Sequence, residues 1–272
     1  MKRVKSHIRR LDLRLLLFTL VISLSLACGG ATGSIVDENG TAKPVVDRGE
    51  EIVAEHVKRE AVPFRKDRIR FTIREEGEKT QVIELDAWRR HQDDTTTTIS
   101  VIAKPAEDAG LGTMTIEEKG QPTVVVSYAV SRDEFRETDS GKMFFGGLTA
   151  QELLGEWNKY SYKFISDASG LNVDGKLKTG EKSVIDATKL IFDPKSFLPV
   201  EMHLFDNTGK EMRVFRSSDL KTVNGHSYFA RTDVVNHVYK SEITIEILNR
   251  DYPEKLDDVL FTRERLKESA KK

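Results

Sequence analysis

The residue types that most often carry chemistry are few in this sequence. The chain has one cysteine, Cys28, so no disulfide can form within it. Its six histidines are scattered, with no H-x-H or H-E-x-x-H spacing that would place two of them on one metal ion: His7, His56, His91, His203, His226 and His237. The sequence also has no G-x-S-x-G stretch and no phosphate-binding glycine-rich loop. We therefore expect no enzyme, no cofactor and no metal site, and what remains is binding and the chemistry of one thiol.

The thiol follows a segment of the kind that directs export. Before residue 15 the segment is strongly basic, with one acid among these charged residues: Lys2, Arg3, Lys5, Arg9, Arg10, Asp12 and Arg14. Residues 15–27 are uncharged and apolar, but they fall short of the about 20 residues that a helix needs to span a bilayer. A basic start, a short apolar run and small residues after it are typical of a secretory signal peptide, which we expect over residues 1–27.

The residues around the thiol add a second expectation. Residues 24–28 read Leu-Ser-Leu-Ala-Cys, which resembles the lipobox at which bacteria attach diacylglycerol to a cysteine before they cleave the leader. The resemblance implies a mature protein that begins at lipidated Cys28 and is held on a membrane by its acyl chains. Gly29, rather than an aspartate, follows the cysteine, which favours the outer membrane over the inner one. The alternatives are cleavage by the ordinary signal peptidase and an uncleaved membrane anchor, which would have to bury Asp12 and Arg14.

Composition limits the rest of the chain to one soluble domain. The sequence has 272 residues, of which 38% are hydrophobic and 32% charged, and its net charge is −1. These values are typical of a globular protein and give no basic surface for nucleic acid. Residues 28–46 are small and polar after the cysteine, which indicates a flexible tether. We expect the folded domain over residues 47–272.

The spacing of apolar residues predicts one early helix and a large sheet. Ile52, Val53 and Val57 recur at helical spacing within residues 47–61, and His56, on the same face, is expected to pack in the core. After the helix the period changes to two, which predicts half-buried antiparallel strands. The expected strands cover residues 69–73, 83–87, 95–103, 113–118, 123–130, 184–192, 200–205, 211–215, 227–235 and 241–248. About ten strands require a sheet that is closed or curled.

A helix is predicted between the two series of strands. Thr149 and Glu152 fit a capping box, and Leu148 and Leu153 are placed as a hydrophobic staple. We expect the helix to continue to Tyr160 and to interrupt the sheet. Large apolar residues gather here beside two adjacent glycines, and we expect residues 143–160 to act as a lid on a cavity or, alternatively, as core that plugs it. The candidates for this role are Phe144, Phe145, Leu148, Leu153, Leu154 and Trp157.

The order of these parts resembles the outer-membrane lipoprotein-sorting family, the LolA/LolB-like proteins. The resemblance covers residues 64–268, which we expect to be one cooperative unit. It is carried by these phrases in order: Ile99 to Pro105, Phe144 to Leu148, Leu198 to Glu201, Phe205 to Lys210, Asp219 to Gly225, and Phe261-Thr262 with Leu266. The resemblance implies a mainly β fold, an incomplete curled antiparallel barrel with helices at its open side, and an apolar cavity that accepts acyl chains.

Two functions follow from these expectations. The first is an envelope lipoprotein that binds a lipid or the acyl chains of a lipoprotein and aids lipid or lipoprotein sorting or transport. The alternative is a non-catalytic envelope protein that senses stress or binds a peptide or protein partner with the same barrel. The lining of the concave face discriminates between them, because acyl chains need apolar walls and peptides need polar groups.

Overall fold

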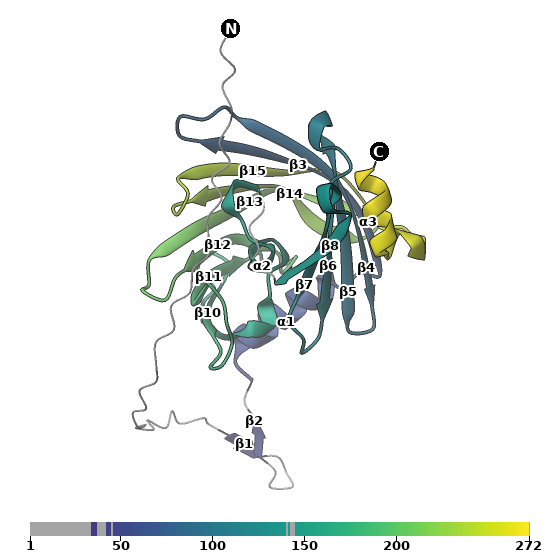
Figure 1. The fold of residues 1–272 in the computed structure, drawn as a ribbon. Coiled ribbons are helices and arrows are strands. Elements are labelled where there is room, and N and C mark those ends of the chain that lie inside the picture. The colour runs from purple at the N-terminus through teal and green to yellow at the C-terminus, as the bar shows by residue number, and fades with distance from the viewer. Residues whose placement is uncertain (1–33, 37–41, 45, 140, 142–144, 272) are drawn as a thin grey trace, which may run out of the picture. The chain divides into compact units, whose positions relative to one another are not determined.

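The computed structural model describes residues 34–36, 42–44, 46–139, 141 and 145–271 (Figure 1). The chain divides into two compact units, Met1–Val45 and Val46–Lys272. The described part of the first unit is a short antiparallel hairpin of β1 (Ser34–Val36) and β2 (Ala42–Pro44). The expected signal peptide over residues 1–27 and the lipidation site at Cys28 lie outside the described residues.

The second unit is built on one antiparallel sheet. Within the described residues the sheet has thirteen strands in the order β8-β7-β6-β5-β4-β3-β15-β14-β13-β12-β11-β10-β9. The strands are β3 (Phe64–Glu75), β4 (Gln81–Gln92), β5 (Thr95–Lys104), β6 (Gly112–Glu118), β7 (Val124–Ala129), β8 (Glu134–Asp139), β9 (Tyr160–Ser166), β10 (Leu171–Leu177), β11 (Ala187–Phe192), β12 (Pro199–Phe205), β13 (Glu211–Val223), β14 (His226–Asn236) and β15 (Ser241–Asp251). The sheet curls strongly, and its end strands, β8 and β9, do not pair with each other, so the barrel is incomplete (Figure 1).

The two series of strands join at the centre of the sheet. Strand β3, the first of the domain, pairs with β15, the last, in a register that places Ile73 opposite Ile243 and Phe71 opposite Ile245. Each neighbouring pair elsewhere in the sheet is consecutive in the sequence. The single long-range pairing of β3 with β15 therefore makes one continuous sheet out of two meanders.

One face of the sheet and two helices enclose the main core. Phe71 and Ile73 of β3 and Leu85 of β4 are buried in this core with residues from β9 to β15. Helix α1 (Arg48–Glu60) buries Ile52 and Val53 in the same core, and α2 (Ala150–Leu154) lies within the curve of the sheet (Figure 1). The alternation of apolar side chains thus decides which face of each strand turns inward.

A second core lies on the other face of β5 to β7. Ile99, Met114 and Val126 are buried there together with Leu266 of α3 (Arg263–Ala270). Figure 1 shows α3 on the outside of the curled sheet, where it contacts β5, β6 and β7. Residues 99–101 and 113–116 keep the period of two, and their apolar side chains face this second core.

The sequence-based expectations are largely confirmed, with one correction. The helix expected over residues 47–61 is α1, each expected strand has a counterpart, and the fold is the expected incomplete antiparallel barrel. The helix expected to reach Tyr160 ends at Leu154, because Gly155 adopts a left-handed conformation with φ 65°. A 3-10 turn, Trp157–Lys159, follows, and Tyr160 begins β9. Strands β8, β9 and β10 and helix α3 were not expected from the sequence.

The short 3-10 turns occupy connections between these elements. They are Ala106–Asp108, Val130–Arg132, Phe145–Gly147, Trp157–Lys159 and Asp258–Phe261. No helix in the described part of the chain is long and apolar enough to cross a membrane.

Candidate functional site

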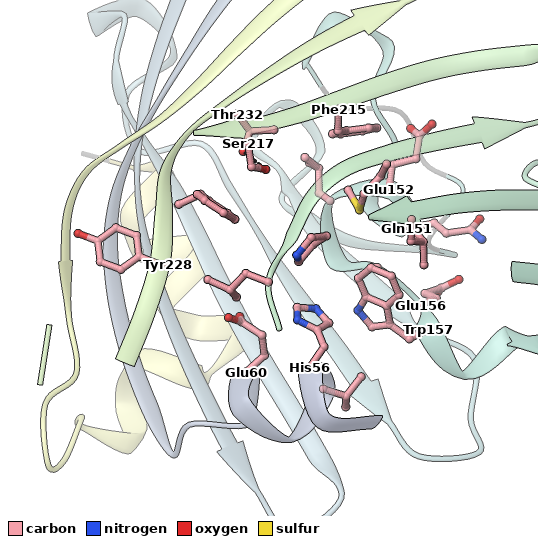
Figure 2. A pocket seen from close by; sticks show the side chains of 18 of the residues that line it. His56, Glu60, Gln151, Glu152, Glu156, Trp157, Phe215, Ser217, Tyr228 and Thr232 are labelled. Atoms are coloured by element: carbon pink, nitrogen blue, oxygen red, sulfur yellow. Dashed lines mark hydrogen bonds between the residues drawn. The ribbon is translucent and has the colours of Figure 1, made fainter. Parts of the chain in front are cut away.

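A cavity of about 470 Å³ lies on the concave side of the sheet. Its walls come from α1, from α2 and the turn after it, and from strands in both halves of the sheet. Figure 2 shows this arrangement, with His56 and Glu60 of α1 on one side and Ser217, Thr232 and Tyr228 on the strands that face them. The curl of the sheet makes the cavity, because it brings β4 to β6 and β11 to β13 around the same space.

One part of the lining is apolar. Leu190 of β11, Met202 and Leu204 of β12, and Phe215 of β13 line the cavity and pack with the main core. Trp157 closes this group from the turn after α2, and its ring lies 6.4 Å from that of Phe192 between centroids. These side chains form a continuous apolar wall, since they come from neighbouring strands on one face of the sheet.

Another part of the lining is charged. Three arginines, Arg65 of β3, Arg89 of β4 and Arg250 of β15, line the cavity with Glu60 of α1. Asp67, 3% exposed, lies 2.7 Å and 3.0 Å from two nitrogens of Arg250 and 3.1 Å from Arg65. The expectation of an apolar cavity is therefore incomplete, because part of the lining is a network of buried ion pairs.

Glu60 is the second carboxylate of this network. One of its oxygens lies 3.0 Å from Arg65 and 4.0 Å from Arg89. Burial alone would raise the pKa of the Glu60 carboxyl, but Arg65, with smaller contributions from His56, Arg250 and Arg89, holds that pKa below its usual value. Glu60 therefore remains ionised.

Glu117 of β6 lines the cavity near Arg89, and its environment differs from that of Glu60. Within the described structure, its Oε1 atom is buried without a hydrogen-bond partner. Burial raises the pKa of the Glu117 carboxyl, Arg89 opposes this change, and Glu156 adds to it. The Glu117 carboxyl is thus more readily protonated than a glutamate in water.

His56 lies between the α1 helix and the apolar wall. Its ring is 5.0 Å from that of Trp157 in an edge-on arrangement (Figure 2). The same ring lies 5.6 Å from that of Phe192. Burial lowers the pKa of this imidazole, although Glu60 partly opposes the change. The expectation that His56 packs in the core is confirmed, and a neutral ring suits this position. No group of His, Cys, Asp and Glu side chains among the described residues is arranged to hold a metal ion.

The segment before α2 is held tightly to the sheet. The carbonyl oxygen of Gly146 accepts hydrogen bonds from Asn236 at 3.0 Å and from Ser241 at 3.3 Å, and that of Gly147 accepts one from Arg213 at 2.9 Å. Both glycines have positive φ angles, 63° and 76°. A Cβ atom at Gly146 would lie 2.6 Å from Ile243, so this close approach requires glycine.

The capping box expected from the sequence is present and is tied to the same anchor. The Thr149 side chain accepts from the Glu152 backbone, and the Glu152 side chain accepts from the Thr149 backbone at 2.6 Å. Glu152 also lies 2.8 Å from Arg213, the residue that binds Gly147, and both side chains of this pair are almost fully buried. Arg213 thus binds both the glycine turn, through the Gly147 carbonyl, and the helix cap, through Glu152.

The residues proposed from the sequence as cavity or lid residues separate into two groups. Phe145 packs against the main core with its ring 5.5 Å from that of Phe71, and Leu148 is fully buried in that core. Leu153 and Trp157 line the cavity. Phe144 and the side chain of Leu154 lie outside the described part of the structure, so their expected place in this group is untested.

Sequence reasoning did not find the charged part of the lining, although a signal was present. Arg65 and Asp67 have the same parity along β3 as the inward residues Phe71 and Ile73. Arg89 likewise has the same parity along β4 as Leu85. Extending the alternation past the last apolar residue would have placed these charges on the concave face.

The fold is similar to that of several solved structures. A putative outer membrane lipoprotein-sorting protein domain from Vibrio parahaemolyticus superposes with a TM-score of 0.73 at 13% identity, over 81% of this chain and 98% of that one. A LolA superfamily protein from Nitrosomonas europaea gives a TM-score of 0.63 at 10% identity, over 79% of this chain and 98% of that one. The LolA-like resemblance stated from the sequence is therefore confirmed for the fold.

A DUF1329 family protein from Desulfovibrio piger has the same fold, with a TM-score of 0.72 at 14% identity over 81% of this chain and all of that one. A family model described as "Uncharacterized protein" matches residues 94–268, and the chain belongs to that family. No curated protein matches the sequence.

Proposed function

We propose that this chain is an exported, non-catalytic envelope protein that binds the acyl chain of a lipid or lipoprotein in its cavity and so aids lipid or lipoprotein sorting. The observation that carries the proposal is the apolar wall formed by Leu190, Met202, Leu204 and Phe215 inside a cavity of about 470 Å³. This volume lies within the range of about 300–1,000 Å³ that is usual for small-ligand sites. Each methylene group moved from water to such a wall contributes about 0.8 kcal/mol.

The comparisons support this choice over other apolar ligands. One similar structure is a putative lipoprotein-sorting domain and another belongs to the LolA superfamily. The leader over residues 1–27 and the lipobox-like residues before Cys28 support export and anchoring on the periplasmic side of a membrane, with the outer membrane favoured. A carrier of acyl chains is useful in that compartment, because acyl chains do not cross an aqueous space unaided.

A second candidate function is the binding of a peptide or protein partner. It is favoured by the charged lining, since Arg65, Arg89 and Arg250 offer polar groups that a peptide can use. A peptide ligand would engage both the arginines and the apolar wall, and it would leave little of the cavity to an acyl chain.

Binding of a fluorescent fatty acid tests the proposal. The full chain carrying Cys28→Ala, which cannot be acylated, should bind the probe in the micromolar range or tighter. Met202→Glu places a charge in the apolar wall and should weaken binding about tenfold or more. The matched control is Met212→Glu, because Met212 does not line the cavity. No probe binding by the parent, or equal effects of the two substitutions, would contradict an acyl-binding site.

A further inference from the structure

The charged part of the cavity holds one arginine that its neighbours do not satisfy. Asp67 engages Arg250 through both carboxylate oxygens and also lies beside Arg65. Glu60 engages Arg65 at 3.0 Å and reaches Arg89 only at 4.0 Å. Two carboxylates thus serve three guanidinium groups, and Arg89 receives the weakest contact.

Arg89 is also buried where it is unpaired. Its Nε atom is inaccessible to solvent and has no hydrogen-bond partner in the described structure. Burial, together with the neighbouring charge of Arg65, lowers the pKa of the Arg89 guanidinium, and Glu117 and Glu60 oppose this change without a contact shorter than 4.0 Å. A buried charge without a partner is strongly destabilising, so a group that satisfies Arg89 would bind there favourably.

The nearest remaining acid does not fill this role. Glu117 makes no ion pair with Arg89 within 4.0 Å in the described structure, and its Oε1 atom is itself without a partner. Burial raises the pKa of the Glu117 carboxyl, which favours its neutral form, and among the described residues no carboxylate lies closer to Arg89 than Glu60 at 4.0 Å. One hydroxyl lies beside Arg89, because Thr98 is its cross-strand neighbour and lines the same cavity.

We propose that Arg89 binds the anionic head group of the cavity's ligand, so that the ligand is an amphiphile with a carboxylate or phosphate at one end of its acyl chain. This inference rests on the proposed acyl-binding function and narrows it. A carboxylate or phosphate accepts hydrogen bonds from a guanidinium in a planar, charge-assisted arrangement, which a neutral ester or alcohol cannot reproduce. The apolar wall and Arg89 line the same cavity, as such a ligand requires.

A pair of probes that differ only in head-group charge tests this inference. The full chain carrying Cys28→Ala is titrated with a fluorescent fatty acid and with the methyl ester of the same acid. The acid should bind about tenfold more tightly than the ester, because a hydrogen bond to a charged group is worth about that factor or more. Arg89→Leu should remove the difference by weakening the acid alone, and Arg89→Lys should keep part of it.

Arg90→Leu is the matched control, because Arg90 is the next residue on β4 but pairs with exposed Asp258 at 2.7 Å instead of lining the cavity. It should leave both affinities unchanged. Equal affinities of acid and ester in the parent would overturn the inference while leaving acyl binding intact. Binding of neither probe would overturn the proposed function and this inference with it. Displacement of the acid by millimolar inorganic phosphate without any affinity for the ester would also overturn it, because the site would then bind a free anion.

Discussion

Asp47 accepts a hydrogen bond at 2.8 Å from the backbone nitrogen of Phe164, a residue 117 positions later in the chain. The same carboxylate caps α1 by accepting from the Gly49 backbone at 2.8 Å. Glu50 makes a similar contact two residues away on β9, where its side chain accepts a hydrogen bond from the backbone nitrogen of Tyr162 at 2.7 Å. The first turn of α1 therefore occupies backbone donors at an open edge of the sheet, which protects that edge from pairing with another chain.

Removal of this contact should lower stability in a pH-dependent way. Asp47→Ala should cost about 1 kcal/mol of the free energy of unfolding at neutral pH, the usual value of a helix cap. Hydrogen bonds from the backbones of Gly49 and Phe164 lower the pKa of Asp47 from its ordinary 3.8. The stability that ionised Asp47 provides is therefore present above pH 3.8, and it is lost as the pH falls through the lowered pKa of Asp47. Urea denaturation at neutral pH and at about pH 3 should show the difference shrinking, and Asp167→Ala, at an exposed acid, serves as the control.

The segment before α2 yields a prediction that separates plug from lid. Leu148 is fully buried and its neighbours Gly146 and Gly147 are held by hydrogen bonds, so Leu148→Ala should cost about 2–5 kcal/mol of unfolding free energy. Leu153→Ala should lower the unfolding free energy by less than about 0.5 kcal/mol, because the Leu153 side chain is 39% exposed and lines the cavity. Denaturation of both variants provides the comparison. A small effect of Leu148→Ala would instead mean that this segment leaves its site readily, as a lid does.

Glu117 should make stability depend on pH above its ordinary pKa of 4.5. Burial raises the pKa of its carboxyl above the ordinary 4.5, so the folded state holds this proton more tightly than the unfolded state does. The stability that comes from this tighter proton binding is fully present below pH 4.5, and it is lost as the pH rises through the raised pKa of Glu117. Glu117→Gln should therefore be nearly neutral at about pH 4 and stabilising at about pH 8. Glu118→Gln alters the exposed neighbour and should have no such trend, while an equal effect of Glu117→Gln at both pH values would count against a buried acid.

Lipidation at Cys28 should decide where the protein resides. Cys28→Ala removes the only thiol, and with it the acyl anchor, so the domain should move from the membrane fraction to the soluble periplasmic fraction. Ser25→Ala alters the same short stretch while keeping the thiol, and this variant should stay with the membrane. Retention of the Cys28→Ala variant on membranes after a high-salt wash would favour an uncleaved anchor.

Alternation with period two predicted most of the sheet, because apolar core residues of β3, β4 and β15 alternate with polar residues along each strand. It failed at β8 and β10 for opposite physical reasons. Strand β8 is exposed along nearly its whole length, so it has no apolar face to detect. Strand β10 contains Gly175, which is buried but has no side chain to contribute to the pattern.

Of the cavity lining, the sequence-based candidates included Leu153 and Trp157, but not the wall of Leu190, Met202, Leu204 and Phe215. Leu153 and Trp157 were identified because large apolar residues cluster around a capping box, a local signal. The charged half required knowledge that Arg65, Arg89 and Arg250 meet in space, and this follows from the pairing of β3 with both β4 and β15. Arg250 follows Arg65 by 185 positions, and no local pattern links them.

Native mass spectrometry of the full chain carrying Cys28→Ala, exported by its bacterial host and purified without detergent, tests the central claim most directly. The account predicts a fraction of the protein with a noncovalently bound acyl lipid, released on denaturation, whose head group carries a carboxylate or phosphate. Met202→Glu should deplete this species, and Met212→Glu should not. A protein that is free of lipid, or that carries a peptide in its place, would contradict the claim that the cavity is an acyl-chain site.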